Sequence, residues 1–248
     1  MHIQTAKVLG GSETPTENGI TGAKRCILLL GDNSKRAAII KRGPIGQIAA
    51  EAFSALLLRE WGLCVPEPFV VVEEAGIAFA SADMGYPNLM QPLAIGGMPK
   101  GPARDKALQM AMTIACRLRS ATLAAACDEA IDNRDRNLGN ILWDGNTEAW
   151  IDHAFALGQS EHEDMNKLCM MATLIGEDER ILRGAIAHSL NLQREIPQIA
   201  QTALTQSPVP PQELATYVAE RLSSIGNRLV ARFPHSEDLL SGLYERLS

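Results

Sequence analysis

The feature that most constrains the fold of this chain is residues 127–158, which read CDEAIDNRDRNLGNILWDGNTEAWIDHAFALG. A loop crowded with acids and amides, Asp132–Asn140, comes first, and two short apolar runs on either side of an Asp-Gly turn follow it. An Asp-Gly pair between apolar runs is the strongest local signal of a β-hairpin. The hairpin predicts that the polar loop and Asp152, at the exit of the second strand, meet in space.

The polar residues at the two ends of this hairpin suit phosphoryl transfer. Mg²⁺ takes oxygen ligands and is usually held by one or two protein groups together with substrate phosphates, a role that Asn140 and Asp152 can fill. Asp135 precedes Asn140 by five residues, the spacing of a kinase catalytic loop whose Asp accepts the proton of the substrate hydroxyl. A solvated loop of turn formers is the alternative for residues 132–140. The hairpin and the third oxygen ligand together favour a metal-dependent phosphotransferase.

These residues carry a resemblance to a known family. The run NRDRNLGN followed by WIDHA resembles the signature of the HipA-like kinases and, more distantly, that of phosphatidylinositol 3/4-kinases. The resemblance implies a protein-kinase-like fold that uses ATP and Mg²⁺, with Asp135 as the catalytic Asp and Asn140 and Asp152 as metal ligands. Asn137 stands where relatives often carry His. Asp152 is followed by His153 and Ala154, so the usual Phe switch of protein kinases is absent.

Composition excludes several other classes of protein. The chain has 248 residues, enough for one domain or for two tightly packed lobes. A net charge of −6 argues against a broad nucleic-acid-binding surface, and 4% aromatic residues argue against stacking platforms for single strands. The five cysteines form no C-x-x-C pair and are expected to be reduced core residues. Without an apolar run of about 18 residues or a signal core, we expect a cytoplasmic protein with no membrane span.

The first 24 residues combine a predicted strand, Ile3–Leu9, with a loop rich in glycine and hydroxyl side chains from Gly10 to Gly22. Backbone N–H groups of such a loop can surround nucleotide phosphates, so Gly10, Gly11 and Ser12 are predicted nucleotide contacts. An ordinary surface loop is the alternative. The acidic residues within the loop repel phosphate, and its spacing is not that of a Walker motif.

A second predicted hairpin, residues 25–41, ends in the run AAIIK, which resembles the VAIK strand of kinases. Lys41 is therefore predicted to bind phosphate, against the alternative of a solvated strand end. Glu51 interrupts the apolar stretch of a predicted helix at residues 45–61 and needs a partner if it is buried. Lys41 is the expected partner, as in the Lys–Glu pair of kinases; otherwise Glu51 lies on the wet edge of the helix. The run GLCVPEP at residues 62–68 also matches the HipA-like pattern.

The predicted fold class is α+β, a two-lobe protein-kinase-like fold. A small antiparallel sheet with one helix forms an N-lobe at residues 1–86, completed by strands at 69–73 and 76–81, and a mainly helical C-lobe occupies residues 87–248. Ser81, Asp83 and Met84 fall where a kinase-like chain passes between lobes, so their backbone is expected to contact adenine. Further helices are predicted at residues 103–126, 163–175, 177–190, 192–205, 211–233 and 236–247.

The predicted function is that of a HipA-like, ATP- and Mg²⁺-dependent kinase, with Asp135, Lys41 and Glu51 as catalytic residues. The resemblance implies a Ser or Thr of a protein as acceptor, including Ser12, Thr14 or Thr16 of the chain itself. Two alternatives stay open: a kinase whose acceptor is the hydroxyl of a small molecule or a lipid, and a catalytically silent nucleotide-binding pseudokinase in a toxin–antitoxin-like system. An antitoxin-like partner is compatible with the same resemblance.

Overall fold

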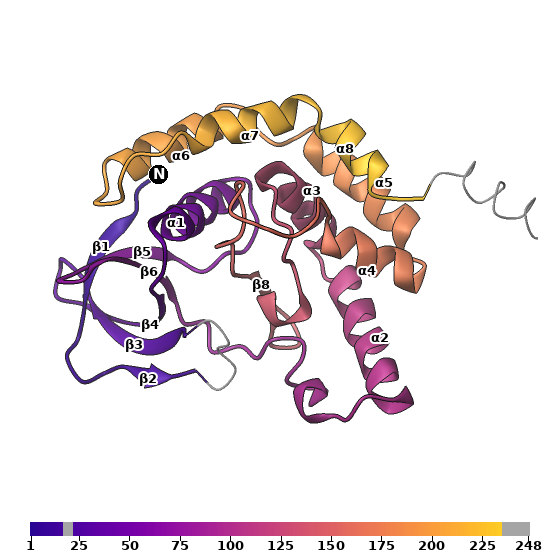
Figure 1. Cartoon of the computed structure of the whole chain (residues 1–248), viewed down its shortest axis with the longest axis horizontal. Helices are drawn as coiled ribbons and strands as arrows, with labels where there is room; N and C mark the ends of the chain where they lie inside the picture. The colour runs from indigo at the N-terminus through magenta and orange to yellow at the C-terminus, as the bar shows by residue number, and fades with distance from the viewer. Residues whose placement is uncertain (17–21, 235–248) are drawn as a thin grey trace, which may run out of the picture.

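A computed structural model of the chain describes residues 1–16 and 22–234. The N-terminal part is a six-stranded sheet with one long helix against it, and the remainder is mainly helical with one short β-ribbon (Figure 1). The strands of the sheet are β1 (Gln4–Val8), β2 (Thr14–Pro15), β3 (Lys24–Leu29), β4 (Lys35–Lys41), β5 (Pro68–Glu73) and β6 (Gly76–Ala82).

The sheet curls back on itself. Its order is β1-β5-β6-β4-β3-β2, and β1 also pairs with β3, so five strands form a closed ring. Closure satisfies the backbone groups that an open edge would leave unpaired. Every pairing is antiparallel except that of β1 with β5, which is parallel and departs from the predicted antiparallel sheet. Small and branched aliphatic side chains and one aromatic ring fill the interior, namely Ala6, Cys26, Leu28, Leu30, Ala38, Ile40, Phe69, Val71, Ala78 and Ala80.

Helix α1 (Ile45–Glu60) lies between the sheet and the helical part of the molecule. All eleven residues from Ile48 to Leu58 are buried, because one side of α1 packs on β5 and β6 and another side packs on α6 (Ile196–Thr205). A helix that is apolar on every face is one that the fold encloses. The charged Glu51 is therefore carried into the interior, between the two halves.

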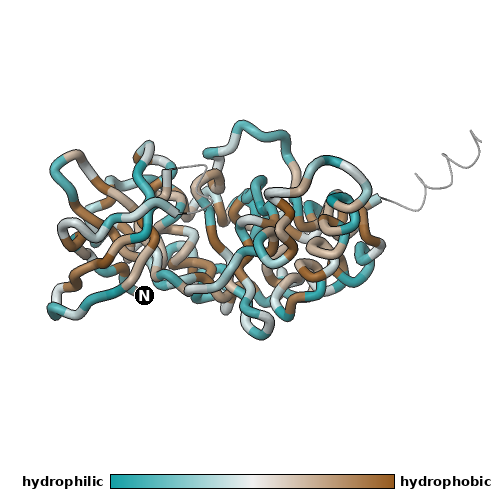
Figure 2. The backbone as a smooth tube through the Cα atoms, turned by 90° about the horizontal axis from the view of Figure 1, so that it is seen from below, coloured by the Kyte–Doolittle hydropathy of each residue, from teal (hydrophilic) through white to brown (hydrophobic). Residues whose placement is uncertain are grey.

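The helical half is built from α2 (Pro102–Arg117), α3 (Ala121–Ile131), α4 (Lys167–Ile175), α5 (Asp178–Ser189), α6, α7 (Leu214–Ser223) and α8 (Ile225–Ala231). Helices α6 and α7 run along one side of the molecule, from above α1 to α8 (Figure 1). Hydrophobic stretches of backbone lie in both halves, and hydrophilic stretches form many of the outer loops (Figure 2). None of the described helices is long and apolar enough to cross a bilayer.

The single helix predicted at residues 103–126 is wrong, because the chain breaks between α2 and α3. Leu118 is extended, with φ −56° and ψ 148°. Ser120 donates its backbone N–H to the Glu148 carboxylate at 2.8 Å, and its hydroxyl donates to the same oxygen at 2.9 Å. The indole N–H of Trp150 donates to the Ser120 hydroxyl at 2.8 Å. Hydrogen bonds to the distant ribbon thus override the helix propensity of the local sequence.

The C-terminal helices also differ from the prediction at their ends. Helix α4 begins at Lys167 rather than at 163, because the Asn166 side chain accepts a hydrogen bond from the backbone of Cys169 and caps the helix. The helix predicted at 211–233 is interrupted at Ser224, which separates α7 from α8. The helix predicted at 236–247 lies outside the described residues, as do residues 17–21.

The hydrogen bonds of Glu148 predict a stability effect. Glu148→Ala should lower the free energy of unfolding by about 2 kcal/mol, because the Ser120 N–H loses a charged acceptor in a poorly hydrated place. Urea unfolding followed by circular dichroism measures this difference. Glu179→Ala is the matched control. That exposed carboxylate pairs with Arg183 on the surface of α5, and its removal should cost less than about 1 kcal/mol. Equal midpoints for the two variants would contradict the role of Glu148 at the break.

Candidate active site

A short ribbon brings the two ends of the polar segment together. Strands β7 (Ile141–Trp143) and β8 (Glu148–Trp150) pair antiparallel, with Ile141 opposite Trp150. The Ile151 N–H donates to the Asn140 carbonyl at 3.1 Å, so the pairing continues one residue past the strands. Asn140 and Asp152 therefore lie close to each other at one end of the ribbon, as the Asp-Gly turn predicted.

A buried guanidinium braces the loop against this ribbon. Arg136 is fully buried and binds both carboxylate oxygens of Asp128 in α3, at 3.0 and 2.9 Å. Its third nitrogen donates to the carbonyls of Asn140 at 3.2 Å and Ile151 at 2.6 Å. It also lies over the Trp150 ring, 5.5 Å from the centroid. These contacts fix the entry to β7 and the exit from β8 at one end of the ribbon.

The loop holds Asp135 next to Asn140. The Asn140 amide nitrogen donates to the Asp135 carbonyl at 2.8 Å, and the Asp135 N–H donates to the Asn133 side chain at 3.2 Å. The first bond turns the carboxamide so that Asn140 Oδ1 points away from the Asp135 carbonyl. The Asp135 carboxylate is partly exposed, and one of its oxygens, Oδ1, is paired with the ammonium of Lys167.

Lys41 joins the sheet to the ribbon through two ion pairs. Its ammonium lies 2.5 Å from Glu51 Oε1 of α1 and 2.8 Å from Asp152 Oδ1. Burial alone would lower the pKa of Lys41, but the attraction of the two carboxylates outweighs it and raises the pKa above its ordinary value. Burial raises the pKa of Glu51, yet the ammonium of Lys41 and the side chain of His153 hold it well below its usual range. Lys41 and Glu51 are therefore both charged at neutral pH.

Asp152 has an unusual backbone conformation. Its φ of +65° places it in the left-handed region, which non-glycine residues adopt only at a cost and often at functional sites. The conformation sends the carboxylate toward Lys41 immediately after the ribbon. With the Asn140 carboxamide oxygen it offers the hard oxygen donors that Mg²⁺ accepts. Among the described residues no group of three His, Cys, Asp or Glu side chains forms a complete metal cage, so a cation here would need ligand oxygens from a substrate.

A cleft opens above these charges, with about 480 Å³ of empty space when the part open to solvent is counted. Lys41, Glu51 and Asp152 lie at its polar end, and the remainder of the lining is mostly apolar, with Ile39, Ala55, Val65, Phe79, Leu142 and Ile151. An apolar slot with a few convergent charged groups is the usual form of a small-molecule site. The sheet, α1 and the ribbon all contribute to it.

Three residues predicted to contact adenine line this cleft: Ser81, Asp83 and Met84. The Asp83 side chain is already occupied, since it accepts from the Gly85 N–H at 2.9 Å and pairs with Arg25 at 3.0 Å. Its backbone N–H donates to the Ala37 carbonyl. The segment is thus held firmly by the sheet, and Met84 is the part of it left to face a ligand.

Gly10, Gly11 and Ser12 do not join the site. They form a turn after β1, and the Ser12 hydroxyl is used internally, donating to the Leu9 carbonyl and accepting from the Ile27 N–H at 3.0 Å. Strand β2 then carries the chain to Pro15, opposite Lys24, which itself lies opposite Ile40. Residues 17–21, the next part of the glycine-rich loop in the sequence, lie outside the described residues.

Charged contacts from the C-terminal helices were not foreseen from the sequence. Glu129 and Asp132, both buried near the end of α3, are bound by side chains of α7 and of the segment that follows α8. Arg221 lies 2.9 Å from Glu129 and 3.2 Å from Asp132, and the Tyr217 hydroxyl donates to Asp132 at 2.6 Å. Arg232 binds Glu129 at 2.9 Å. Asp132 is the left-handed C-cap of α3.

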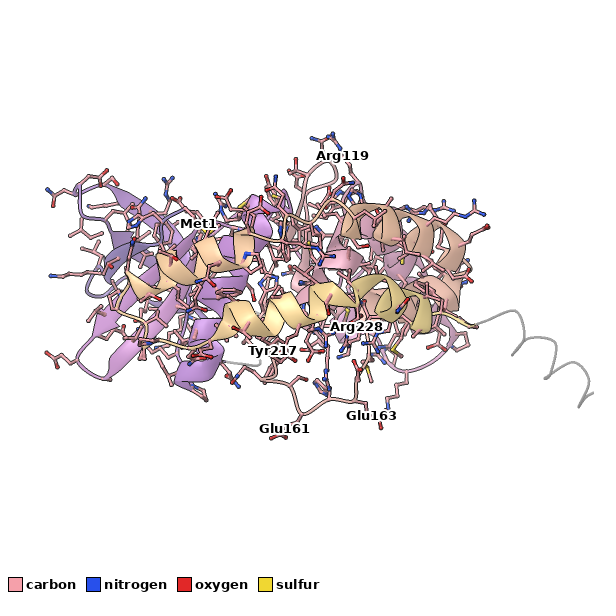
Figure 3. All side chains as sticks on the ribbon, turned by 90° about the horizontal axis from the view of Figure 1, so that it is seen from above. Met1, Arg119, Glu161, Glu163, Tyr217 and Arg228 are labelled. Atoms are coloured by element: carbon pink, nitrogen blue, oxygen red, sulfur yellow. The ribbon has the colours of Figure 1, made fainter. Side chains whose placement is uncertain are left out.

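These contacts place the last helices beside the loop that follows α3. In Figure 3, Tyr217 and Arg228 lie on the side of α7 and α8 that faces the loop bearing Glu161 and Glu163.

The ion pair of Lys167 with Asp135 was also not predicted from the sequence, because a lysine at the first position of a helix gives no indication of its distant partner. The Asn166 N-cap before an apolar run was the one available signal for where α4 begins.

The sequence matches no protein-family model and no curated protein. Solved structures with a similar fold do exist. A proinflammatory kinase of Helicobacter pylori, CtkA, is similar with a TM-score of 0.54 at 12% identity, over 94% of this chain and 99% of that chain. HipA of Shewanella oneidensis MR-1, solved in a toxin–antitoxin complex with HipB and operator DNA, is similar with a TM-score of 0.50 at 12% identity. That match covers 90% of this chain and 66% of the HipA chain.

At 12% identity these likenesses concern the fold, and they agree with the resemblance carried by the NRDRNLGN and WIDHA motifs. The chain has the mixed α/β fold of the HipA-like kinases.

Proposed function

We propose that this chain is a phosphotransferase that uses ATP and Mg²⁺ and transfers the γ-phosphoryl group to the hydroxyl of a protein Ser or Thr. The observation that carries the proposal is Lys41, whose ammonium joins Glu51 of α1 to Asp152 of the ribbon. This lysine–glutamate pair and a metal-binding aspartate must be in place together for a kinase to act. The fold shared with a Helicobacter pylori kinase supports the same reaction class.

Each residue has a role in the proposed reaction. Residues 1–86 and 87–248 act as two lobes, with adenine against Met84 and the phosphates near Lys41. Asn140 and Asp152 would hold Mg²⁺, which neutralises phosphate charge. Asp135 orients the acceptor hydroxyl and takes its proton. The acceptor oxygen bonds to the γ-phosphorus as the bond from that phosphorus to the bridging oxygen breaks, and ADP leaves with the electron pair.

The cleft favours a macromolecular acceptor over a small molecule. The residues that line it include Lys41 and Asp152 but not Asp135, whose carboxylate is partly exposed beside α4 and the loop 159–166. An acceptor that reaches Asp135 therefore approaches over the surface of the helical half. A side chain on a protein segment can make that approach while the rest of the segment stays outside.

The role of Asp135 predicts a loss of phosphate transfer without a loss of ATP binding. Asp135→Ala should reduce phosphate transfer from labelled ATP by at least about 100-fold, the usual contribution of a general base. ATP affinity should change little, because Asp135 is not part of the cleft. Transfer to the chain itself and to water measures the rate, and mass mapping identifies any modified residue. Transfer at the wild-type rate would remove Asp135 from the chemistry.

The role of Asp152 predicts a loss of metal-dependent binding. A ligand at 100 times its dissociation constant stabilises the folded state by about 2.7 kcal/mol, so ATP with Mg²⁺ should raise the melting temperature of the wild type. In Asp152→Ala, most of the additional rise in melting temperature that Mg²⁺ causes in the presence of ATP should be lost. Asp105→Ala, which removes an exposed carboxylate at the start of α2, is the control and should keep it. The same Mg²⁺ increment in both variants would contradict the proposed metal site.

A further inference from the structure

Lys167 is a charged residue at the candidate site that the proposed reaction does not yet use. It is the first residue of α4, and its ammonium is paired with Asp135 Oδ1 from a position 32 residues further along the chain. Both side chains are only partly exposed, 28% for Lys167 and 22% for Asp135. Among residues 1–16 and 22–234, the other carboxylate oxygen, Oδ2, has one long contact, 3.5 Å from the Asn137 amide nitrogen, so it is the oxygen left for an acceptor hydroxyl.

The place of Lys167 is fixed by the residue before it. Asn166 is buried, and its amide nitrogen donates to the Ala125 carbonyl of α3 at 3.1 Å, while its oxygen caps α4 through the Cys169 N–H at 3.2 Å. Helix α3 leads directly into the catalytic loop. The start of α4 is thus anchored to the element that positions Asp135, and the ion pair is built into the fold.

The charges around the site single out Lys167. Lys41 is shared by two carboxylates, and Arg136 is bound to both oxygens of Asp128 in the interior. Within the described part of the chain Lys167 pairs with one carboxylate, and that carboxylate is the group that gains a proton in the proposed reaction. Once protonated, Asp135 no longer balances the ammonium. The cation is then unpaired next to the oxygen that has just acquired a phosphoryl group.

We infer that Lys167 is a second phosphoryl-binding cation, which pairs with Asp135 in the resting site and with the transferred phosphoryl group during and after transfer. This inference rests on the proposed function. In the step, the acceptor proton moves to Asp135 Oδ2, the acceptor oxygen bonds to phosphorus, and ADP departs with the electrons of the broken bond. The ammonium stabilises the negative charge on the non-bridging oxygens of that phosphoryl group. Its own proton does not move.

The inference separates the role of Lys167 from that of Lys41. Lys41 lies in the cleft and should govern nucleotide binding, whereas Lys167 lies beside Asp135, outside the cleft lining, and should govern turnover. Lys167→Met is therefore expected to lower kcat by about 100-fold, as does loss of one preorganised donor in other enzymes. The dissociation constant of ATP with Mg²⁺ should stay within about twofold, and Lys41→Met should instead weaken it at least tenfold. Lys167→Arg, which keeps the charge, should restore part of kcat.

The experiment incubates the full chain with labelled ATP and Mg²⁺ and measures phosphate transfer to the chain itself and to water. Melting curves show that each variant is folded. Arg183→Met is the matched control, since it removes a cation from an exposed ion pair on α5 and should keep the wild-type rate. An inactive wild type would contradict the proposed function itself. If the wild type is active, two results would overturn only the role of Lys167. One is an unchanged kcat in Lys167→Met, and the other is a loss of ATP binding in Lys167→Met like that in Lys41→Met.

Discussion

The ion pair between Arg136 and Asp128 is the interaction on which the rest of the site depends. Both side chains are fully buried, and separating two such charges from water is expensive unless every polar atom finds a partner. The fold meets that condition by using the remaining guanidinium donor on the carbonyls of Asn140 and Ile151. Removing either partner would leave an uncompensated charge in the core. The same contacts fix the backbone of Asn140, one metal-binding candidate, and of Ile151, which precedes the other candidate, Asp152.

Around this centre each carboxylate has a cationic partner. Lys41 pairs with both Glu51 and Asp152, Lys167 pairs with Asp135, and Arg221 pairs with both Glu129 and Asp132. A site that binds a polyanion such as ATP next to several acids needs this balance, because unpaired carboxylates would repel phosphate. The phosphoryl-transfer proposal thus rests on charge arrangement as much as on the motif.

Local signals in the sequence predicted much of this arrangement. The Asp-Gly turn located the ribbon, and the apolar periodicity of residues 45–61 located α1 nearly to the residue. The isolated Glu51 predicted a buried partner, and Lys41 is that partner in the structure. The roles of these residues in catalysis stay predictions. The predictions that the structure confirms depended on residues within about 20 positions of each other in the sequence.

Local sequence patterns did not predict the features that depend on contacts between residues far apart in the chain. The break at Ser120 depends on Glu148 and Trp150, and no local pattern marks it. The turn at Gly10–Ser12 has the composition of a phosphate loop, but strand register places it away from Lys41. The pairing of β1 with both β3 and β5, and the reach of Lys167 to Asp135, likewise depend on how the elements pack.

The path of α6 and α7 has a mechanical consequence. These helices cross from α1 to α3, and the indole of Trp61 at the end of α1 donates to the Gln193 carbonyl just before α6. They therefore act as a strap along one side of the seam between the sheet and the helices. Separation of the two halves on that side would therefore break the packing of α6 on α1 and of α7 on α3.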